Sequence, residues 1–486
     1  MPLPIHRTKI LCTFGPAIGS TEKIKLLLKA GATAFRLNMS HGSHDVHAES
    51  VKLIREVEAE VQTPIPIIAD IQGPKLRVGD LPNDGKVSII NGTEALFADE
   101  RIWEKRGKPD TIIPVRYATI ATDVKKGDVI LFDDGLLKVI VLSTDGEVIT
   151  TIVENGGILK SRKGLNLPNV PYSDSILTEK DKRDIVFAIQ QKADFIALSF
   201  VRDAKDIAEA RAFITANGGD VWIISKIEKP EAVKNLDEII DVSDAIMVAR
   251  GDLGVEMSAA EVPIVQKQII SKCNRRAKPV ITATQMLESM IQNPRPTRAE
   301  ASDVANAVFD GTDCVMLSAE TSVGAYPVET VSYMRTICTE AEKEFVARHT
   351  HIGFMSEQDS ILSQLPDTYA DAIAGAVSRV SREMYLDGIV TMSMSGKAAA
   401  YISSHRLTTP IIAVSEHHPS VRRMQLMWGV QALHFPMQES TDQAIENVKQ
   451  LIVERGFLKK NSTVVVTVGR PLSKRPRTNM LCIEVL

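Results

Sequence analysis

Residues 221–249 read VWIISKIEKPEAVKNLDEIIDVSDAIMVA, in which two short apolar runs are separated by a longer helix-like stretch. Continuous apolar runs of this length are typical of strands buried on both faces, as in a parallel sheet. Eight such runs occur along the chain: KILCTF (9–14), ATAFRLN (32–38), IPIIAD (65–70), DFIALSF (194–200), VWIISK (221–226), DAIMVA (244–249), PVITAT (279–284) and DCVMLS (313–318). The count predicts an α/β fold built on a (β/α)8 TIM barrel, with its site at the C-terminal strand ends.

The spacing of these runs indicates a large insertion. Ala69 and Ala197, near the ends of the third and fourth runs, are 128 residues apart, whereas the other successive strand ends are 23–35 residues apart. The intervening residues form short alternating runs separated by turn signals: PNDG (82–85), KKGD (125–128), DDG (133–135), TDGE (144–147) and ENGG (154–157). This pattern predicts hairpins of a small inserted β-barrel.

After about Phe345 the strands and helices of a separate three-layer α/β domain are expected. We therefore predict three domains. They are a barrel of residues 1–72 and 173–345, an inserted β-barrel of residues 73–172, and a C-terminal α/β domain of residues 346–486.

The composition excludes several classes of protein. A chain of 486 residues is too long for one hydrophobic core, and its net charge of −4 gives no polybasic footprint for nucleic acid. No apolar run approaches the ~18–20 residues of a membrane span, and the N-terminus lacks the apolar core of a signal peptide. The five cysteines are odd in number and form no CxxC pair, which favours reduced thiols in a cytoplasm.

Polar residues follow seven of the eight apolar runs. The segments are TFGP (13–16), RLNMSHG (36–42), ADIQGPKLR (69–77), SKIEKPEAV (225–233), ARGDLGVE (249–256), TATQMLESM (282–290) and LSAET (317–321). A single polar strand end means little, because every strand must stop. Seven together predict an active site on one rim of the barrel.

Lys226 and Glu228 are two residues apart on a strand, so both point to the same face. A surface ion pair is the alternative interpretation. Asp252 follows on the next strand beside Gly251, where an Asx turn or a helix N-cap is the alternative. Glu228 and Asp252 could share one hard divalent cation, Mg2+ or Mn2+ in its place, which recruits substrate oxygens as further ligands. A metal beside a fixed ammonium suits a phosphate or an enolate.

A P-loop nucleotide site is absent, because no Gly-rich loop ends in Gly-Lys-Ser or Gly-Lys-Thr. A nucleotide would have to be held by side chains instead. Arg36, Arg77 and Lys163 are the candidates, and a solvated surface charge is the alternative for each of them taken alone.

The segment IISKIEKPEAV (223–233) resembles the active-site signature of the pyruvate kinases. RLNMSHG, VARGDLGVE (248–256), TATQMLESM with NPRPTRAE (293–300), and DGTDCVMLSAETSVGAYP (310–327) are similar to that family too, in the same order. The resemblance covers essentially the whole chain. It implies transfer of the phosphoryl group of phosphoenolpyruvate to ADP, which gives pyruvate and ATP in the last step of glycolysis.

The resemblance also implies roles for the matching positions. Lys226 would stabilise the phosphoryl group in flight and the enolate oxygen, and Glu228 with Asp252 would hold Mg2+. Thr284 would contact substrate and, with Ser318, would belong to the water network that protonates the enolate. The substrate carboxylate would be received by the backbone of Ala249, Arg250 and Gly251. Phosphates would be gripped by Arg36, Arg77 and Lys163, and the nucleotide side would be lined by Thr13, Asn38 and His41. A second Mg2+ would arrive with ADP. The insertion would close over the site as a lid.

One departure from the family pattern concerns K+. Many members need K+ and carry Glu in a GPE motif, whereas this sequence reads GPKLR, with Lys75 in place of Glu and Ile71 in place of the usual Thr. The chain thus resembles a bacterial-type, K+-independent subgroup, in which the Lys75 ammonium would substitute for K+. A neutral surface lysine is the alternative.

The segment SMSGKAAA (393–400) begins a helix after a strand, so Ser393, Ser395, Gly396 and Lys397 could bind a phosphate. A plain helix N-cap is the alternative. Members of the family bind sugar phosphates or AMP in this loop, although Met394 replaces a lysine seen in some. The resemblance also implies an allosteric homotetramer.

Two rival functions belong to other classes. A barrel lyase or aldolase acting on pyruvate-like enolates could use the same carboxylates, but it needs neither the lid nor Lys226. A non-catalytic metabolite sensor would bind ADP without turnover.

Overall fold

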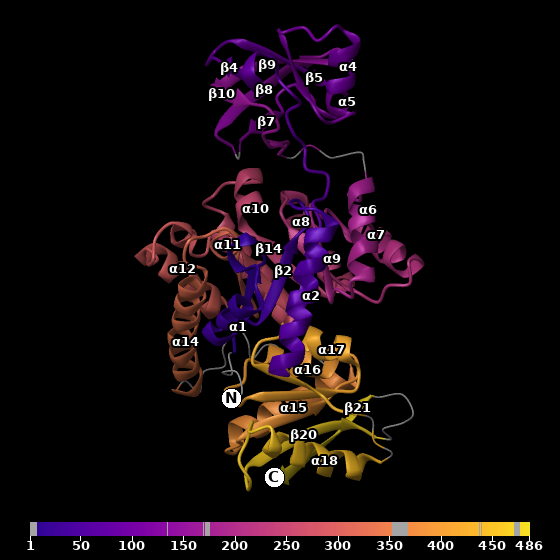
Figure 1. Cartoon of the computed structure of the whole chain (residues 1–486), viewed down its shortest axis with the longest axis vertical. Helices are drawn as coiled ribbons and strands as arrows, with labels where there is room; N and C mark the ends of the chain where they lie inside the picture. The colour runs from indigo at the N-terminus through magenta and orange to yellow at the C-terminus, as the bar shows by residue number, and fades with distance from the viewer. Residues whose placement is uncertain are drawn as a thin grey trace.

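The computed structural model describes residues 7–133, 135–168, 170, 175–351, 368–436, 438, 440–470 and 477–486. In Figure 1 the inserted segment lies at the top, the barrel in the middle and the C-terminal α/β unit at the bottom. The predicted end of the insertion, between residues 172 and 173, lies outside the described residues.

The eight predicted strands form a closed parallel barrel, so the TIM-barrel prediction is confirmed. Going round the barrel, the strands are β1 (Lys9–Thr13), β2 (Ala34–Asn38), β3 (Ile67–Asp70), β12 (Phe195–Leu198), β13 (Trp222–Ile227), β14 (Ala245–Ala249), β15 (Val280–Ala283) and β16 (Cys314–Leu317). Closure comes from β1, which pairs with both β2 and β16. All eight strands therefore end on the same rim.

Helices cover the outside of the barrel. The longer ones are α1 (Thr21–Ala30), α2 (His44–Val61), α6 (Glu179–Gln190), α7 (Ala204–Ala216), α11 (Val262–Arg275), α12 (Arg298–Asp310) and α14 (Pro327–His351). Shorter ones are α8 (Pro230–Lys234), α9 (Leu236–Val242), α10 (Arg250–Glu256) and α13 (Ala319–Ser322). Reciprocal capping boxes fix the starts of α6 and α12, through Thr178 with Asp181 and Thr297 with Glu300. Helix α14 continues past the domain boundary predicted at residue 345.

The insertion contains two sheets. One has six strands in the order β11 (Leu165–Asn166), β7 (Val129–Phe132), β8 (Leu137–Thr144), β9 (Val148–Asn155), β5 (Glu94–Asp99) and β6 (Ile112–Val115). The other pairs β4 (Lys86–Ile89) with β10 (Gly157–Lys160). The turn predicted at residues 82–85 is wrong, because they form the one-turn helix α3 (Pro82–Gly85). Proline presets φ for a first helical turn, and Gly85 ends it with φ +72°. Two more short helices, α4 (Glu100–Lys105) and α5 (Ile120–Asp123), carry no pattern that predicted them.

The C-terminal α/β unit is confirmed. Its sheet runs β19 (Val430–His434), β18 (Ile411–Ser415), β17 (Gly388–Met392), β20 (Thr463–Gly469), β21 (Thr478–Val485), and only β21 is antiparallel to its neighbour. One face packs on α15 (Tyr369–Glu383), α16 (Lys397–Ser404) and α17 (His418–Met424), and the other on α18 (Thr441–Glu454). The two apolar clusters make a three-layer unit.

Three arginines of the C-terminal unit dock on aspartates that stand just before barrel strands. Arg406 Nη1 lies 2.8 Å from Asp313 Oδ1, ahead of β16, and both side chains are buried. Arg422 Nε lies 2.6 Å from Asp194 Oδ1, ahead of β12. Arg423 pairs in the same way with Asp220, ahead of β13. The N-terminal rim of the barrel is therefore the docking surface for the C-terminal unit.

All five cysteines are free thiols. Burial raises the pKa of four of them, Cys12, Cys273, Cys314 and Cys338, well above the ordinary value. Among the described residues, no helix is both long enough and apolar enough to cross a membrane.

Replacing Arg406 with leucine is expected to destabilise the protein by about 3–5 kcal/mol, because the buried Asp313 carboxylate keeps its charge and loses its cation. The midpoint of urea unfolding measures this loss. The matched control is Arg379→Leu, which breaks an exposed pair with Glu383 and should leave the midpoint unchanged. Equal midpoints for both variants would contradict the docking role of Arg406.

Candidate active site

Three side chains from different barrel strands meet around the carboxylate of Asp70. Arg36 Nε donates to Asp70 Oδ2 over 2.6 Å, and Arg36 Nη1 donates to Thr13 Oγ1 over 3.1 Å. Lys226 Nζ lies 3.3 Å from Asp70 Oδ1. Asp70 is only 2% exposed. The structure thus brings together Thr13, Arg36 and Lys226, which are far apart in the sequence.

Lys226 and Glu228 lie side by side on β13, as their spacing predicts. Lys226 Nζ is 2.8 Å from Glu228 Oε1, and it donates a 2.7 Å hydrogen bond to Ser199 Oγ. Glu228 Oε2 accepts a 2.7 Å hydrogen bond from the backbone N–H of Phe200. Both side chains are buried, so the solvated surface pair that the sequence left open is wrong.

Asp70 and Ser199 were not among the candidate residues from the sequence. Each stands at the end of an apolar run that was assigned as a strand, and that position is the signal that could have found them. Ser199 Oγ also donates to the carbonyl of Ile71 over 2.7 Å, so the hydroxyl links the Lys226 ammonium to the end of β3.

Burial and ion pairing compete for the charges of this cluster. Burial lowers the pKa of Lys226, but the carboxylates of Asp70 and Glu228 outweigh it and hold that pKa above its ordinary value. Burial raises the pKa of Asp70, and Arg36 with Lys226 more than reverse this, so the pKa ends below its usual range. Burial raises the pKa of Glu228 to about 7, despite the nearby ammonium. Lys226 therefore stays cationic, while that single ammonium does not offset the effect of burial on the pKa of Glu228.

The residues present fit a divalent cation at Glu228. Asp252, in the first turn of α10, is close enough that its charge contributes to the raised pKa values of Lys226 and Glu228. Glu228 Oε1 is buried and has no hydrogen-bond partner of good geometry in the described structure. Carboxylate oxygens suit Mg2+, which takes few protein ligands and adds water and substrate oxygens. Among the described residues no group of three or more His, Cys, Asp or Glu could hold a metal, so any such site depends on other ligands as well.

The backbone at the start of α10 contacts Thr284, and the residues there are buried or half-buried. The N–H of Gly251 donates to Thr284 Oγ1 over 2.8 Å. The Arg250 side chain is buried, where its Nη2 donates to the carbonyl of Thr284 over 2.7 Å and its Nη1 lies 2.7 Å from an oxygen of Asp303. Thr284 itself has φ +66°, a left-handed conformation that is costly for a β-branched residue and is found at functional sites. The local geometry presents backbone rather than the arginine side chain.

Ser318 follows β16 on the same rim. Its hydroxyl is buried and has no hydrogen-bond partner among the described residues. Its backbone N–H donates to Glu320 Oε2 over 2.7 Å, and burial raises the pKa of Glu320. The sequence had not singled out Glu320, although it lies in the quoted LSAET segment.

The residues expected on the nucleotide side are more dispersed. Asn38 ends β2 and accepts a hydrogen bond from Ser40 N–H, and His41 is exposed in the following loop. Arg77 and Lys163 belong to the insertion, where Arg77 donates to the carbonyl of Arg162 and Lys163 pairs with Asp133 at 2.7 Å. The contacts described for these two cations are within the insertion. None of them goes to the Asp70 cluster, by which we mean Asp70 with Arg36, Lys226, Glu228 and Ser199.

Lys75 is exposed just beyond β3, at the start of the insertion. A Cβ placed on Gly164 would lie 3.7 Å from Lys75 Cε, so the lysine stem runs beside the returning chain. The side chain of Ile71 is buried and offers no oxygen ligand.

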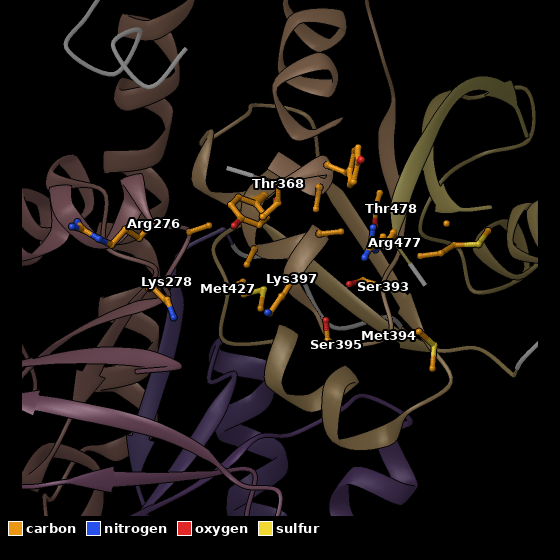
Figure 2. Close-up of a pocket in the computed structure, with 18 of the residues that line it drawn as sticks. Arg276, Lys278, Thr368, Ser393, Met394, Ser395, Lys397, Met427, Arg477 and Thr478 are labelled. Carbon is orange, nitrogen blue, oxygen red and sulfur yellow. The ribbon is translucent and has the colours of Figure 1, made fainter. Parts of the chain in front are cut away.

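Away from the barrel rim, a cavity of about 860 Å3 lies between the barrel and the C-terminal unit. Figure 2 shows Ser393, Ser395 and Lys397 on one side of it, with Arg276 and Lys278 of the barrel on the other. Ser393 Oγ accepts a 3.0 Å hydrogen bond from Gly396 N–H, and Gly396 has φ +84° directly before α16. The predicted loop is thus the wall of a pocket rather than an isolated helix cap.

Comparison with known proteins gives consistent matches. A family model described as "Pyruvate kinase, barrel domain" matches residues 5–331, and one described as "Pyruvate kinase, alpha/beta domain" matches residues 371–484. Pyruvate kinase of Geobacillus stearothermophilus is 42% identical over 485 residues, which cover 99% of this chain and 80% of the relative. Pyruvate kinase 2 of Synechocystis sp. is 42% identical over 491 residues (100% and 80%), and pyruvate kinase of Clostridium acetobutylicum is 39% identical over 484 residues (99% and 100%).

Replacing Asp70 with asparagine is expected to lower the urea midpoint at pH 7, because two buried cations lose their shared carboxylate. Since the folded-state pKa of Asp70 is lowered, its contribution is present above the unfolded pKa of about 4 and is lost as pH falls through the folded pKa. The gap between wild type and variant should therefore narrow below about pH 4. Midpoints measured from pH 7 to pH 3 that stay parallel would contradict this account.

Proposed function

The chain belongs to the pyruvate kinase family, and from that premise we propose that the Asp70 cluster transfers the phosphoryl group of phosphoenolpyruvate to ADP. The observation that supports this site is the buried ammonium of Lys226, held among Asp70, Glu228 and Ser199 at the C-terminal rim of the barrel. A barrel lyase or a non-catalytic sensor, the two alternatives from the sequence, would not require both the Lys226 ammonium and an inserted segment above the same rim.

Lys226 and Arg36 supply fixed positive charge to the phosphoryl group in flight. Phosphoryl transfer proceeds through a loose transition state, so positioning and charge matter more than covalent chemistry. Asp70 holds both cations in one place through its two oxygens. Because the cluster is buried, its charges are already oriented before substrate arrives, which strengthens their effect on developing charge.

Glu228 and Asp252 would hold Mg2+, which when bound neutralises charge on phosphate and enolate oxygens. The fit rests on the buried Glu228 Oε1, whose one ion-pair contact in the described residues is the Lys226 ammonium at 2.8 Å, and on an all-oxygen donor set. Mn2+ is an acceptable substitute on the same donors, and a second Mg2+ would enter with ADP.

The substrate carboxylate is received by the backbone of Ala249, Arg250 and Gly251, beside Thr284. Thr284 Oγ1 accepts from Gly251 N–H, so binding of an anion there would exchange one acceptor for another. Ser318, whose buried hydroxyl has no hydrogen-bond partner in the part of the chain that the structure describes, is available for the water network that brings a proton to the enolate carbon. Thr284 and Ser318 thereby serve the second half of the reaction.

ADP would lie between the barrel rim and the insertion. Thr13, Asn38 and His41 line the barrel side, while Arg77 and Lys163 reach the phosphates from the insertion. Closing of the insertion as a lid would bring these two groups together and exclude water, which could otherwise hydrolyse the phosphoryl donor. Lys163 would then exchange Asp133 for a phosphate.

The finer features of this activity are also proposals. Lys75 would replace K+, supported by its position beside Gly164 and by the apolar side chain at Ile71. A phosphorylated activator, a sugar phosphate or AMP, would bind Ser393, Ser395, Gly396 and Lys397, supported by the cavity of Figure 2 with its basic residues. A homotetramer is supported by the exposed apolar side chains of Tyr369 and Tyr385 around α15 and of Ile483 on the edge strand β21.

The three-domain division predicted from the sequence is kept as a proposal, with the insertion as lid and the C-terminal unit as effector and oligomerisation domain. A cytoplasmic location is supported by the five free thiols.

The first experiment is release of pyruvate from phosphoenolpyruvate with ADP and Mg2+. Wild type should turn over, and Glu228→Gln should lose at least about 10³-fold in kcat/KM, because the amide keeps the shape and removes the charge that balances Lys226 and the metal. Glu238→Gln, at an exposed position on α9, is the matched control and should retain activity. Wild-type turnover in the Glu228 variant would discard the metal assignment.

The same assay tests Lys75 when it is run with and without K+. Wild type should be equally active in both buffers, and Lys75→Glu should become dependent on K+, because a carboxylate there requires a cation where the ammonium had supplied one. Lys86→Glu, an exposed charge reversal elsewhere on the insertion, controls for the change in net charge. Full activity of the Lys75 variant without K+, at matched ionic strength in Na+, would remove this role.

A further inference from the structure

The loop of residues 39–43, between β2 and α2, carries His41 and directly follows Asn38. We call it the nucleotide loop, since the proposed function places ADP against it. Met39 is buried and its N–H donates to the carbonyl of Asp70 at the end of β3 over 2.9 Å, whereas residues 40–43 are partly or fully exposed. Its conformation therefore depends on contacts with neighbouring elements.

Two of those contacts are made by the ion pair of Lys180 and Asp184 on α6. Lys180 Nζ donates to the carbonyl of Met39 over 2.6 Å, and it also donates to Asp184 Oδ2 over 2.6 Å. His44 Nε2 lies 2.7 Å from Asp184 Oδ1, and the His44 ring stacks on Phe187 with centroids 4.3 Å apart. Met39 begins the nucleotide loop and His44 immediately follows it. Both ends of the loop are thus attached to the same helix.

Helix α6 is also attached to the first linker of the insertion. Asp181 is fully buried, and its Oδ1 accepts a 3.0 Å hydrogen bond from the N–H of Gly73. Its Oδ2 accepts from the backbone and hydroxyl of Thr178, which caps the helix where the chain returns from the insertion. The first two turns of α6 therefore join the outgoing linker, the returning chain and the nucleotide loop.

The contact between α6 and the nucleotide loop is made by charged side chains, which favours a role in positioning the loop over simple packing. Asp184 is 3% exposed on its side chain, and burying a carboxylate is costly unless its hydrogen bonds are made, here by Lys180 and His44. An apolar contact would pack α2 on α6 as well, but it could not hold the carbonyl of Met39 at a defined point. A charge-assisted hydrogen bond to a backbone carbonyl fixes that position.

We propose that Lys180 and Asp184 are positioning residues for the nucleotide: they hold the nucleotide loop so that Asn38 and His41 meet ADP, without touching substrate themselves. The inference rests on the proposed function, because it needs ADP at this loop. Lys226, Gly251 and Thr284, which would serve phosphoenolpyruvate, stand on β13, on α10 and after β15, and make none of the contacts described for Lys180 and Asp184. We call these contacts of Lys180 and Asp184 the clamp, and their loss is expected to affect the nucleotide more than phosphoenolpyruvate.

The test compares KM for ADP, KM for phosphoenolpyruvate, kcat and Tm in the full chain. Lys180→Met and Asp184→Asn should each raise KM for ADP by about five- to tenfold, as expected when one charge-assisted hydrogen bond is lost. KM for phosphoenolpyruvate should change less than about twofold, and Lys180→Arg should recover most of the loss. Lys182→Met is the matched control on the same helix, since Lys182 pairs at the surface with Glu179, and its constants should equal those of wild type.

The outcomes separate this inference from the function on which it rests. Lys163→Met serves as a reference variant for the nucleotide site and should raise KM for ADP. If it does so while Lys180→Met and Asp184→Asn leave KM for ADP unchanged, the clamp is refuted. Equal increases in both KM values together with a lower Tm would show a general structural role and also refute it. An inactive wild type, or an unchanged KM for ADP in Lys163→Met, would contradict the proposed nucleotide site and this inference with it.

Lys180→Met protects the test against a folding defect. The Lys180 side chain is 42% exposed, so its loss leaves the buried carboxylate of Asp184 paired with His44. If Asp184→Asn does not fold, the comparison of Lys180→Met with Lys180→Arg and Lys182→Met decides between the same outcomes.

Discussion

Closure of the barrel by pairing of β1 with β16 is the constraint on which the rest of the structure depends. It brings the first strand beside the last, so that Thr13 Oγ1 donates to the carbonyl of Leu317 across 304 positions of sequence. Because all eight strands are parallel, the same closure gathers their C-terminal residues on one rim and their N-terminal residues on the other. One rim carries the Asp70 cluster, and the other carries the aspartates that dock the C-terminal unit.

The Asp70 cluster shows how such a rim can hold charge that stability alone would not favour. Two cations, Arg36 and Lys226, share one carboxylate, and Glu228 sits beside them with its pKa raised by burial to about 7. A buried ion pair rarely repays its desolvation in full, so apolar residues of similar volume would often serve stability as well or better. A cluster kept despite that cost is consistent with a site where fixed charge meets phosphate.

The sequence predicts some of these features better than others, for physical reasons. The eight barrel strands follow from apolar runs, because a strand buried on both faces must be apolar throughout. That Lys226 and Glu228 lie side by side follows from strand geometry, because residues two apart on a strand point to the same face. The contacts of Asp70 with both Arg36 and Lys226 could not be predicted, because these three residues lie on three different strands. No local sequence pattern indicates which carboxylate will lie between two cations. The binding of the Arg250 guanidinium by Asp303 and by the carbonyl of Thr284 is equally non-local. The one-turn helix α3 was missed because Pro, Asn, Asp and Gly also make turns, and the choice depends on neighbouring structure.

The two rims are linked through single elements, and this limits how independently they can move. Strand β16 begins just after Asp313 and ends just before Ser318. It therefore spans the barrel from the N-terminal rim, where the C-terminal unit docks, to the residue proposed for the proton-transfer network. Helix α16 begins at the loop of the 860 Å3 cavity and ends two residues before Arg406, which pairs with Asp313. A packed strand and a packed helix are stiff along their axes, since close packing leaves little room for compression. A displacement of α16 must therefore be absorbed by the Arg406–Asp313 pair, at the cost of a buried charge contact, or be passed to β16. That ion pair acts together with the hydrogen bonds of Arg406 to Asn274 and to the carbonyl of Gly311, which join the same helix to the barrel.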